Sequence, residues 1–277
     1  QGLSLADLPM LAKPFPSVEG TLSAEGRLHG GWGDPVLTGV VHVSSACWRP
    51  GGKIHRGEAD FRGGRSGFTV PRFQWDDAVR GEGAYLFGKG VRISAEVERT
   101  PAEQLFDFSS ATGTLAGWVS GRLSLSSGDR PGWEGWARLI GEKGRWAGVP
   151  FDLARAVVFF QGPRVEVESL EVKQSSGAFR AGGVATRRPL TPAAPGPVWD
   201  WTGTGSAASF SVGSTVWSGS WTARGFGSWR AGTGAGELRS PDLALEGMPA
   251  VSLGAVRAQF SWSPALWRLE DLTLDRG

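Results

Sequence analysis

The sequence predicts an all-β protein: an elongated, repetitive antiparallel sheet rolled into an open apolar groove, with one or two very short helices. Three observations predict this fold class. Apolar and polar residues alternate with a period of two along most of the 277 residues, as in strands with one apolar face. Turn-forming Gly, Pro, Asp and Ser separate these segments at short intervals. Helical periodicity is nearly absent, so no helix layer is expected to cover the sheet.

Alternating segments recur along the chain, and we expect about fifteen strands. The clearest ranges are 91–98, 113–125, 151–159, 164–168, 179–185 and 217–225. In residues 113–125, Gly113, Gly117 and Gly121 fall on the same face as the leucines. Glycine weakens a strand, so its recurrence needs a reason. Strong curvature is one, because glycine relieves crowding on the inner face and allows bulges.

Two short segments are expected to be helical. Thr100-Pro-Ala-Glu103 places a capping residue, a proline at the first helical position and an acid at the third in the right order. This pattern predicts a single helical turn through Phe106. Ser4-Leu-Ala-Asp7 is a weaker copy that runs towards Leu11.

The composition excludes several classes of protein. The formal net charge is +2, from 29 Lys and Arg against 27 Asp and Glu, so nucleic acid is not an expected partner. Cys47 is the only cysteine, which excludes an internal disulfide and fits a cytoplasmic or a periplasmic protein. No apolar run reaches about 18 residues, so no membrane-spanning helix is expected. The chain starts at Gln1 and ends at Gly277 directly after strand-like residues, and we expect it to be a piece of a longer protein.

The chain also repeats itself with a period of about 95 residues. Gly20-Thr-Leu22 and Gly113-Thr-Leu115 open two copies, and a looser third begins near Trp217. A second landmark, an alanine followed closely by phenylalanine, recurs at Phe61, Phe159 and Phe260. The predicted organisation is copy one at 1–110, copy two at 111–188, a Pro/Ala-rich connection at 189–198, and a truncated copy three at 199–277, all in one continuous fragment. Stacked repeats of this kind contact only their neighbours.

Copy two carries a family resemblance. Its sequence runs Gly-Thr-Leu-x-Gly-x-Val-x-Gly-x-Leu from Gly113, then Gly-x-Pro-Phe-Asp-x-Leu-x-x-Ala from Gly148, then Val-x-Val-x-x-Leu from Val165 and Ser-Gly-Ala-Phe-x-Ala-Gly-Gly from Ser176. This succession resembles the repeated region of the AsmA-like proteins of diderm bacteria, the TamB group in particular. Copy one is similar and copy three more loosely so, and together the resemblance covers most of the chain.

The resemblance implies both a fold and a function. It implies a long sheet rolled into a gutter-like tube, the β-taco, whose concave face is lined with apolar side chains. It implies a periplasmic bridge, part of an inner-membrane-anchored protein, that carries phospholipids between the inner and outer membranes and supports outer-membrane biogenesis. The implied partners are phospholipid acyl chains and, through parts outside this fragment, an inner-membrane anchor and an outer-membrane β-barrel partner. In copy three, tryptophans replace the usual aliphatic residues: Trp217, Trp221, Trp229, Trp262 and Trp267.

Residues expected to line the lipid groove share the apolar side of their segments. They are Leu115, Val119, Leu123, Leu125, Leu153, Val157, Phe159, Val165, Val167 and Phe179. Two alternatives stay open. The same alternation would suit a closed structural spacer with a dry β core. The 14 tryptophans would suit a carbohydrate-binding or adhesin-like module if Trp118, Trp136 and Trp146 lined an exposed ridge.

Other motifs give no enzyme, cofactor or metal prediction. His29, His42 and His55 are evenly spaced, but their spacing does not place them reliably on one cross-strand row, and no metal site is expected. Gly232-Thr-Gly-Ala-Gly236 lacks the following helix that a dinucleotide loop needs. Asp76-Asp77 lies between strand-like segments and is expected to form a turn. No Gly-x-Ser-x-Gly elbow is present. We expect no catalytic residues.

Overall fold

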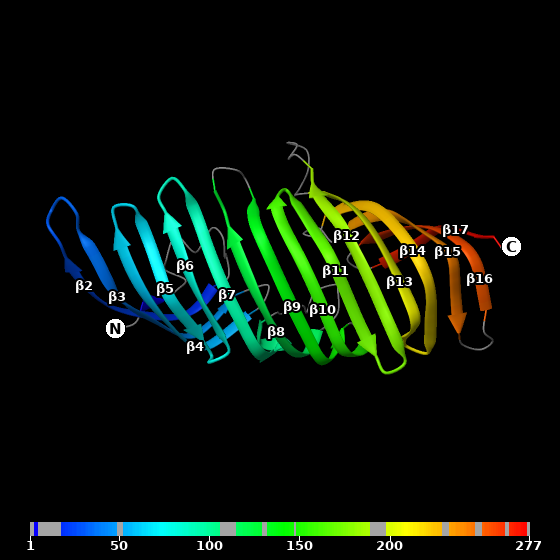
Figure 1. Ribbon diagram of the computed structural model, residues 1–277, viewed down its shortest axis with the longest axis horizontal. Coiled ribbons are helices and arrows are strands. Elements are labelled where there is room, and N and C mark those ends of the chain that lie inside the picture. The colour runs from blue at the N-terminus through cyan, green and yellow to red at the C-terminus, as the bar shows by residue number, and fades with distance from the viewer. Residues whose placement is uncertain are drawn as a thin grey trace. The chain divides into compact units, whose positions relative to one another are not determined.

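A computed structural model gives the structure of the chain, and all its described strands belong to one antiparallel sheet (Figure 1). The described residues are 3–4, 18–48, 52–105, 115–128, 132–146, 148–188, 198–228, 233–246, 251–263 and 266–275. Strands adjacent in the sequence pair in the sheet. The predicted fold class, an all-β antiparallel sheet that rolls and stays open, is confirmed.

The strands are β1 (Leu3–Ser4), β2 (Val18–His29), β3 (Val36–Trp48), β4 (Gly52–Gly64), β5 (Gly67–Trp75), β6 (Val79–Leu86), β7 (Gly90–Pro101), β8 (Leu115–Ser126), β9 (Trp133–Trp146), β10 (Val149–Gly162), β11 (Arg164–Gln174), β12 (Gly177–Arg187), β13 (Trp199–Val212), β14 (Thr215–Ser228), β15 (Thr233–Glu246), β16 (Val251–Ser263) and β17 (Leu266–Asp275). The described strands slightly exceed the expected number. One of them is the two-residue β1, which pairs with β2 through Leu3 and Leu22.

Chain contacts divide the molecule into two compact units. Unit 1 comprises residues 1–110 and 114–137, and unit 2 comprises residues 111–113 and 138–277. The boundaries of these two units do not coincide with those of the three predicted repeat copies, which stay a prediction.

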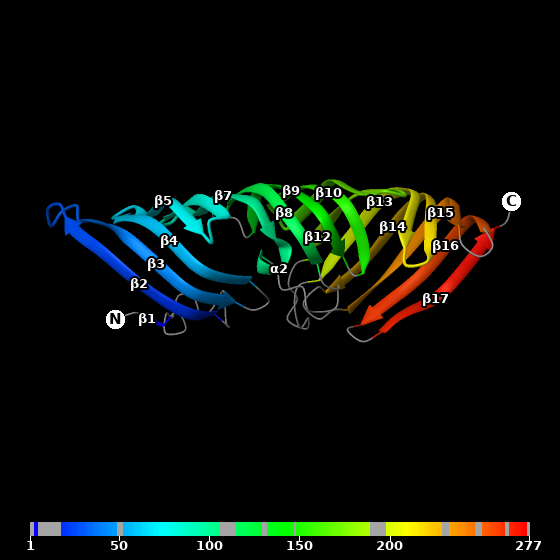
Figure 2. The same cartoon turned by 90° about the horizontal axis from the view of Figure 1, so that it is seen from below.

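One short helix, α2 (Ala102–Leu105), confirms the helical turn predicted after Thr100. It contacts β4 as well as β7 and β8, and Figure 2 shows it beneath the curved strands of unit 1. Strands β5 and β6 separate β4 from β7 in the sheet. One helical turn can touch both only because the sheet curves towards it. Of the other predicted helix, Ser4 lies in β1 and the rest falls outside the described residues.

Cross-strand register separates an apolar face from a charged face in each unit. In unit 1, Val41, Ala59 and Phe73 lie opposite one another in β3, β4 and β5. On the other face of the same strands, Arg72 pairs with Glu58 and Asp60. Because side chains alternate along a strand, each predicted run of alternating residues produces these two faces directly.

Several glycines of the apolar face lie beneath aromatic rings from neighbouring strands. Gly81 lies opposite Phe73, and a Cβ added at Gly81 would come within 2.4 Å of the Phe73 ring. A Cβ at Gly39 would likewise lie 2.7 Å from the ring of Phe61. Glycine therefore leaves room for a ring to lie flat on the sheet, in addition to easing the curvature that was expected of it.

In the part of the chain that the structure describes, the sheet is a single layer over most of its area. Among the described residues no large side chain is fully buried, and even Val256, the most buried of the apolar strand residues, keeps 6% of its surface exposed. The accessible surface is 17843 Å² for 29.3 kDa, whereas a compact globular protein of this mass exposes about 11,500 Å². Within the described residues, the apolar face is therefore largely without a second protein layer.

Candidate functional site

An apolar hollow of about 420 Å³ lies on the apolar face of unit 2, over β11, β12 and β13. Its size falls within the usual range of ligand sites, roughly 300–1,000 Å³. No charged side chain lines it. The lining residues are Val165, Val167, Leu170, Ala181, Gly182, Gly183, Val184, Ala185, Trp199, Trp201 and Thr202.

Small residues in the middle strand form the floor of the hollow. Val165 lies opposite Ala185 and Val167 opposite Gly183, while Ala185 in turn lies opposite Trp201. A Cβ at Gly183 would come within 2.4 Å of the Thr202 carbonyl oxygen. No larger residue fits there without moving the backbone. The valines of β11 form one wall, the tryptophans of β13 form the other, and the floor between them stays low.

Aromatic rings fill the apolar face on the C-terminal side of this hollow. The ring centroids of Trp201 on β13 and Phe260 on β16 are 6.4 Å apart, although three strand spacings amount to about 14 Å. The rings meet above the glycine positions of the intervening strands, Gly225 and Gly236. Phe179 and Trp221 approach to 6.0 Å in the same way across β13. Trp221, one of the tryptophans of copy three, therefore covers part of the apolar face.

Seven of the ten predicted groove residues lie on the apolar faces. In unit 1, Leu123 lies opposite Ala95 and Leu125 opposite Ile93, and Val119 is largely buried. Leu115 shares this face of β8 by alternation. In unit 2, Val165 and Val167 line the hollow.

Phe179, the seventh, lies outside the hollow. Its ring packs against Phe210 at 5.5 Å and against Trp221. It belongs to the part of the face that aromatic side chains already fill.

The other three predicted residues lie on the charged face, and their placement in the groove was wrong. Leu153, Val157 and Phe159 lie opposite Lys173, Ser169 and Glu166. Arg155, on the same side of β10, adds its charge to the surroundings of Glu171. The apolar side of β10 is formed instead by Ala154, Ala156, Val158 and Phe160, which pair with Val172, Leu170, Val167 and Val165.

The error has a physical cause. The segment Val157-Val-Phe-Phe160 is apolar on both sides, so alternation does not mark its inner face. A register shift between Val157 and Val158 further disturbs the pairing. Arg155 was the available signal, because it shares a side with Leu153 and Val157.

Trp199 and Trp201 were missed although their sequence carries a signal. Trp199-Asp-Trp-Thr202 alternates strictly, and the exposure of β13 follows the same period. The segment directly follows the Pro/Ala-rich stretch, and the predicted organisation places it at the start of copy three, with no site residue in it.

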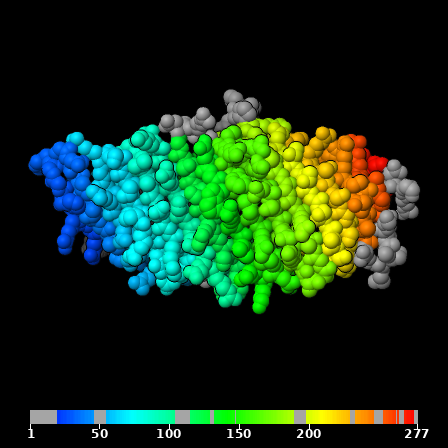
Figure 3. Space-filling view, viewed as in Figure 1, coloured from blue at the N-terminus to red at the C-terminus, as the bar shows by residue number. Residues whose placement is uncertain are grey.

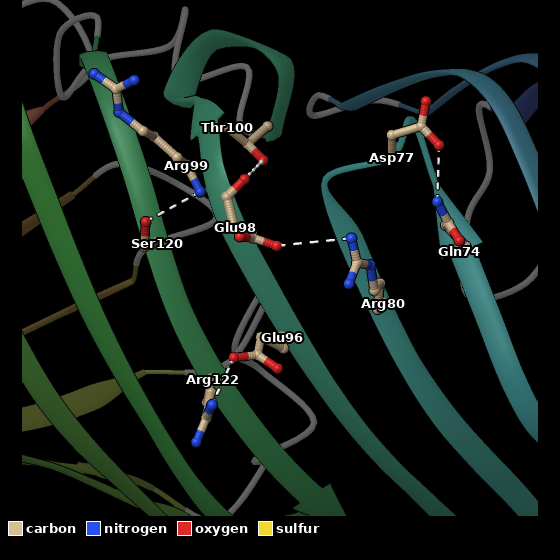
Figure 4. A network of polar contacts seen from close by, with 9 residues as sticks. All are labelled: Gln74, Asp77, Arg80, Glu96, Glu98, Arg99, Thr100, Ser120 and Arg122. Atoms are coloured by element: carbon tan, nitrogen blue, oxygen red, sulfur yellow. Dashed lines mark hydrogen bonds and ion pairs between the residues drawn. The ribbon is translucent and has the colours of Figure 1, made fainter.

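Ion pairs cover the charged face. In unit 1, Glu98 lies 3.7 Å from Arg80 and Glu96 lies 2.7 Å from Arg122, and Figure 4 shows these pairs side by side on neighbouring strands. In unit 2, Glu237 binds Arg224, Arg239 and Arg257 at 2.7–2.9 Å. The hydrogen bond from Arg239, supported by the other two guanidinium groups, lowers the pKa of Glu237 to about 2.

The remaining candidates for chemistry find structural explanations. Asp76 and Asp77 form a turn with positive φ, and the Asp76 carboxylate accepts hydrogen bonds from the backbone N–H groups of His55 and Arg56. His42 lies 3.8 Å from Glu58. No group of three or more metal-ligating side chains occurs in the described part of the chain. Gly234 and Gly236 lie within strand β15.

Comparisons with protein-family models, with curated proteins and with solved structures find no match to this chain. Within the described ranges, no helix has the length and apolar character needed to cross a membrane.

Proposed function

We propose that this chain is part of an AsmA-like protein of the TamB group, which carries phospholipids between the inner and outer membranes of a diderm bacterium along its apolar face. One observation carries the proposal: a single-layered sheet presents an apolar face that no second layer covers within the described residues, and that face contains an apolar hollow without charged groups. Burying each methylene group contributes about 0.8 kcal/mol. Contacts with a few acyl carbons therefore suffice for binding, and no single contact holds the acyl chain in one place.

The proposal is tested with a photo-crosslinking residue at Val167, in the hollow, and at Val157, on the charged face of the neighbouring strand. The purified chain is extracted and analysed for lipid by mass spectrometry. We expect co-purifying phospholipid, a lipid crosslink from position 167, and none from position 157.

Charged substitutions at the same positions give a matched second test. Val167→Asp should reduce co-purifying phospholipid several-fold, because it places a carboxylate in the hollow, whereas Val157→Asp should retain it. Far-UV circular dichroism checks that both variants fold. Absence of lipid and of crosslinks at both positions would contradict the proposal and favour a structural spacer.

The carbohydrate-binding alternative depends on an exposed ridge of Trp118, Trp136 and Trp146, of which Trp146 is 51% exposed. A sugar would need the open ring of an exposed tryptophan. The guanidinium carbon of Arg99 lies 4.8 Å from the ring centre of Trp118, so this ring already has a partner.

A further inference from the structure

Exposed apolar side chains form a row along one rim of unit 1. Leu28 lies opposite Leu37, Leu37 opposite Gly63, Gly63 opposite Phe68, and Phe68 opposite Tyr85, across β2 to β6. These side chains are between 37% and 73% exposed. Farther along the same face the apolar residues are more buried, as Phe73 and Val79 are at 8%.

The turns beyond this row carry further exposed aromatic rings. Trp32, between β2 and β3, is completely exposed, and Phe87, between β6 and β7, is 47% exposed. The Phe87 ring makes edge contacts with Phe68 at 5.8 Å and with Tyr85 at 5.6 Å, so these three rings form one cluster. The turns lie along the upper rim of unit 1 in Figure 1, and Figure 3 shows the β2–β3 turn projecting freely.

A row of arginines lies on the opposite face of the same rim. Arg27 lies opposite Thr38, Thr38 opposite Arg62, and Arg62 opposite Thr69, and the row continues through Ala84 to Arg92. The row contains no carboxylate. Arg65 and Lys89, in the turns of this rim, add two more positive charges, and Asp34 is the acidic residue of the described turns on this rim.

These cations differ from three other arginines of unit 1. Farther from the rim, Arg72, Arg80 and Arg122 all pair with carboxylates. Within the described residues, no carboxylate pairs with the basic side chains of the rim, which are Arg27, Arg62, Arg65, Lys89 and Arg92. The rim is thus a band of unpaired positive charge beside a band of exposed aromatic and aliphatic side chains.

We propose that this rim binds the surface of an anionic phospholipid bilayer. Aromatic rings favour the headgroup level of a membrane, where one end of the ring is apolar and the other wet. Unpaired Lys and Arg are attracted by anionic headgroups, and their stems lie along the apolar boundary. A soluble polyanion would satisfy the arginines but would leave the aromatic row exposed. The inference goes beyond the proposed transport and does not depend on it.

The test is co-sedimentation of the chain with sucrose-loaded vesicles of phosphatidylcholine, alone or mixed equally with phosphatidylglycerol. We expect binding to the mixed vesicles, little binding to the neutral ones, and a loss of binding at high salt, since salt screens exposed charges. Arg62→Ser with Lys89→Ser should weaken binding to the mixed vesicles by about tenfold or more, because each basic residue near a membrane surface contributes on the order of fivefold.

The aromatic contribution is tested by Trp32→Ser with Phe87→Ser, for which we also expect about a tenfold loss, since both apolar side chains would leave the interface. Both residues lie in exposed turns, so the fold should survive. Matched controls are Arg72→Ser, an exposed but paired arginine, and Trp146→Ser, a 51% exposed tryptophan of unit 2. Both should bind normally.

Equal binding to neutral and mixed vesicles, or no binding to either, would overturn the proposal. So would binding that the arginine variants lose and the aromatic variants keep, with heparin competing fully, because this pattern identifies a soluble polyanion as the partner. Lipid co-purification is measured separately, so a failure here is distinguishable from a failure of the proposed transport.

Discussion

At the scale of single residues, a glycine of the apolar face often packs against an aromatic ring from the neighbouring strand. Phe73 lies over Gly81, Phe61 over Gly39, and Trp221 over Gly205. A glycine exposes its backbone and buries no side chain, and a ring from the next strand covers that backbone while burying its own apolar surface. Where no described residue forms an opposing layer, this lateral packing replaces part of a core.

Gly81→Ala should destabilise the chain by about 1–3 kcal/mol, the usual cost of overpacking. The added Cβ would lie 2.3 Å from the Ser94 carbonyl oxygen and 2.4 Å from the Phe73 ring. Urea unfolding followed by circular dichroism measures the change. The control is Gly64→Ala, whose Cβ would meet nothing within 4 Å. The control should leave stability unchanged or raise it by up to about 1 kcal/mol, and equal losses in both variants would contradict the pairing argument.

At the scale of elements, ion clusters join neighbouring strands on the charged face. Glu237 of β15 binds Arg224 of β14, Arg239 of its own strand and Arg257 of β16. The side chain of Glu237 is 12% exposed while the arginines are more than half exposed. One well-shielded carboxylate thus links three strands, which a simple surface ion pair does not do.

This cluster predicts a specific dependence of stability on pH. The pKa of Glu237 falls from the ordinary range, about 4.3, to about 2 in the folded chain. The folded state therefore binds fewer protons than the unfolded state in this window, and the stabilisation is complete above about pH 4.3 and is lost as pH falls towards 2. We expect Glu237→Gln to lower the urea midpoint at neutral pH, by an amount that shrinks towards pH 2.

The control for the pH dependence is Glu82→Gln. Glu82 has no ion-pair partner in the part of the chain that the structure describes, so its exchange should change the midpoint little at any pH. A difference between wild type and Glu237→Gln that stays constant from neutral pH to pH 2 would show that the carboxylate does not act through its charge.

At the scale of the whole molecule, stability comes mainly from contacts between strands that are adjacent in the sheet. The extensive contacts between strands join strands that are adjacent in the sheet, and no large side chain of the described residues is fully buried. Proteins built this way gain stability from each element and its nearest neighbours, so parts of the structure can open without the rest.

Hydrogen exchange measured by mass spectrometry tests this organisation. Gly81→Ala, on β6, should speed amide exchange in β5, β6 and β7 and leave exchange in β14, β15 and β16 at its wild-type rate. Gly64→Ala should leave both groups of strands unchanged. A uniform increase over all described strands would instead indicate all-or-none unfolding.

The sequence by itself determined the local features. Alternation identified the strands and the apolar side of β8, Thr100-Pro-Ala-Glu103 predicted α2, and Asp76-Asp77 predicted a turn. Each of these depends on residues close together in the chain, so propensity and periodicity are sufficient.

Only the tertiary structure decided which segments act together. The side of β10 that faces the hollow depends on a register shift in a segment apolar on both sides, and Val158 rather than Val157 lies there. Trp201 meets Phe260 across two intervening strands, and the apolar and cationic rows of the rim exist only through the pairing of strands β2 to β7. Register between strands is set by bulges and turns along the whole sheet, which is why a period of two, read one segment at a time, cannot supply it.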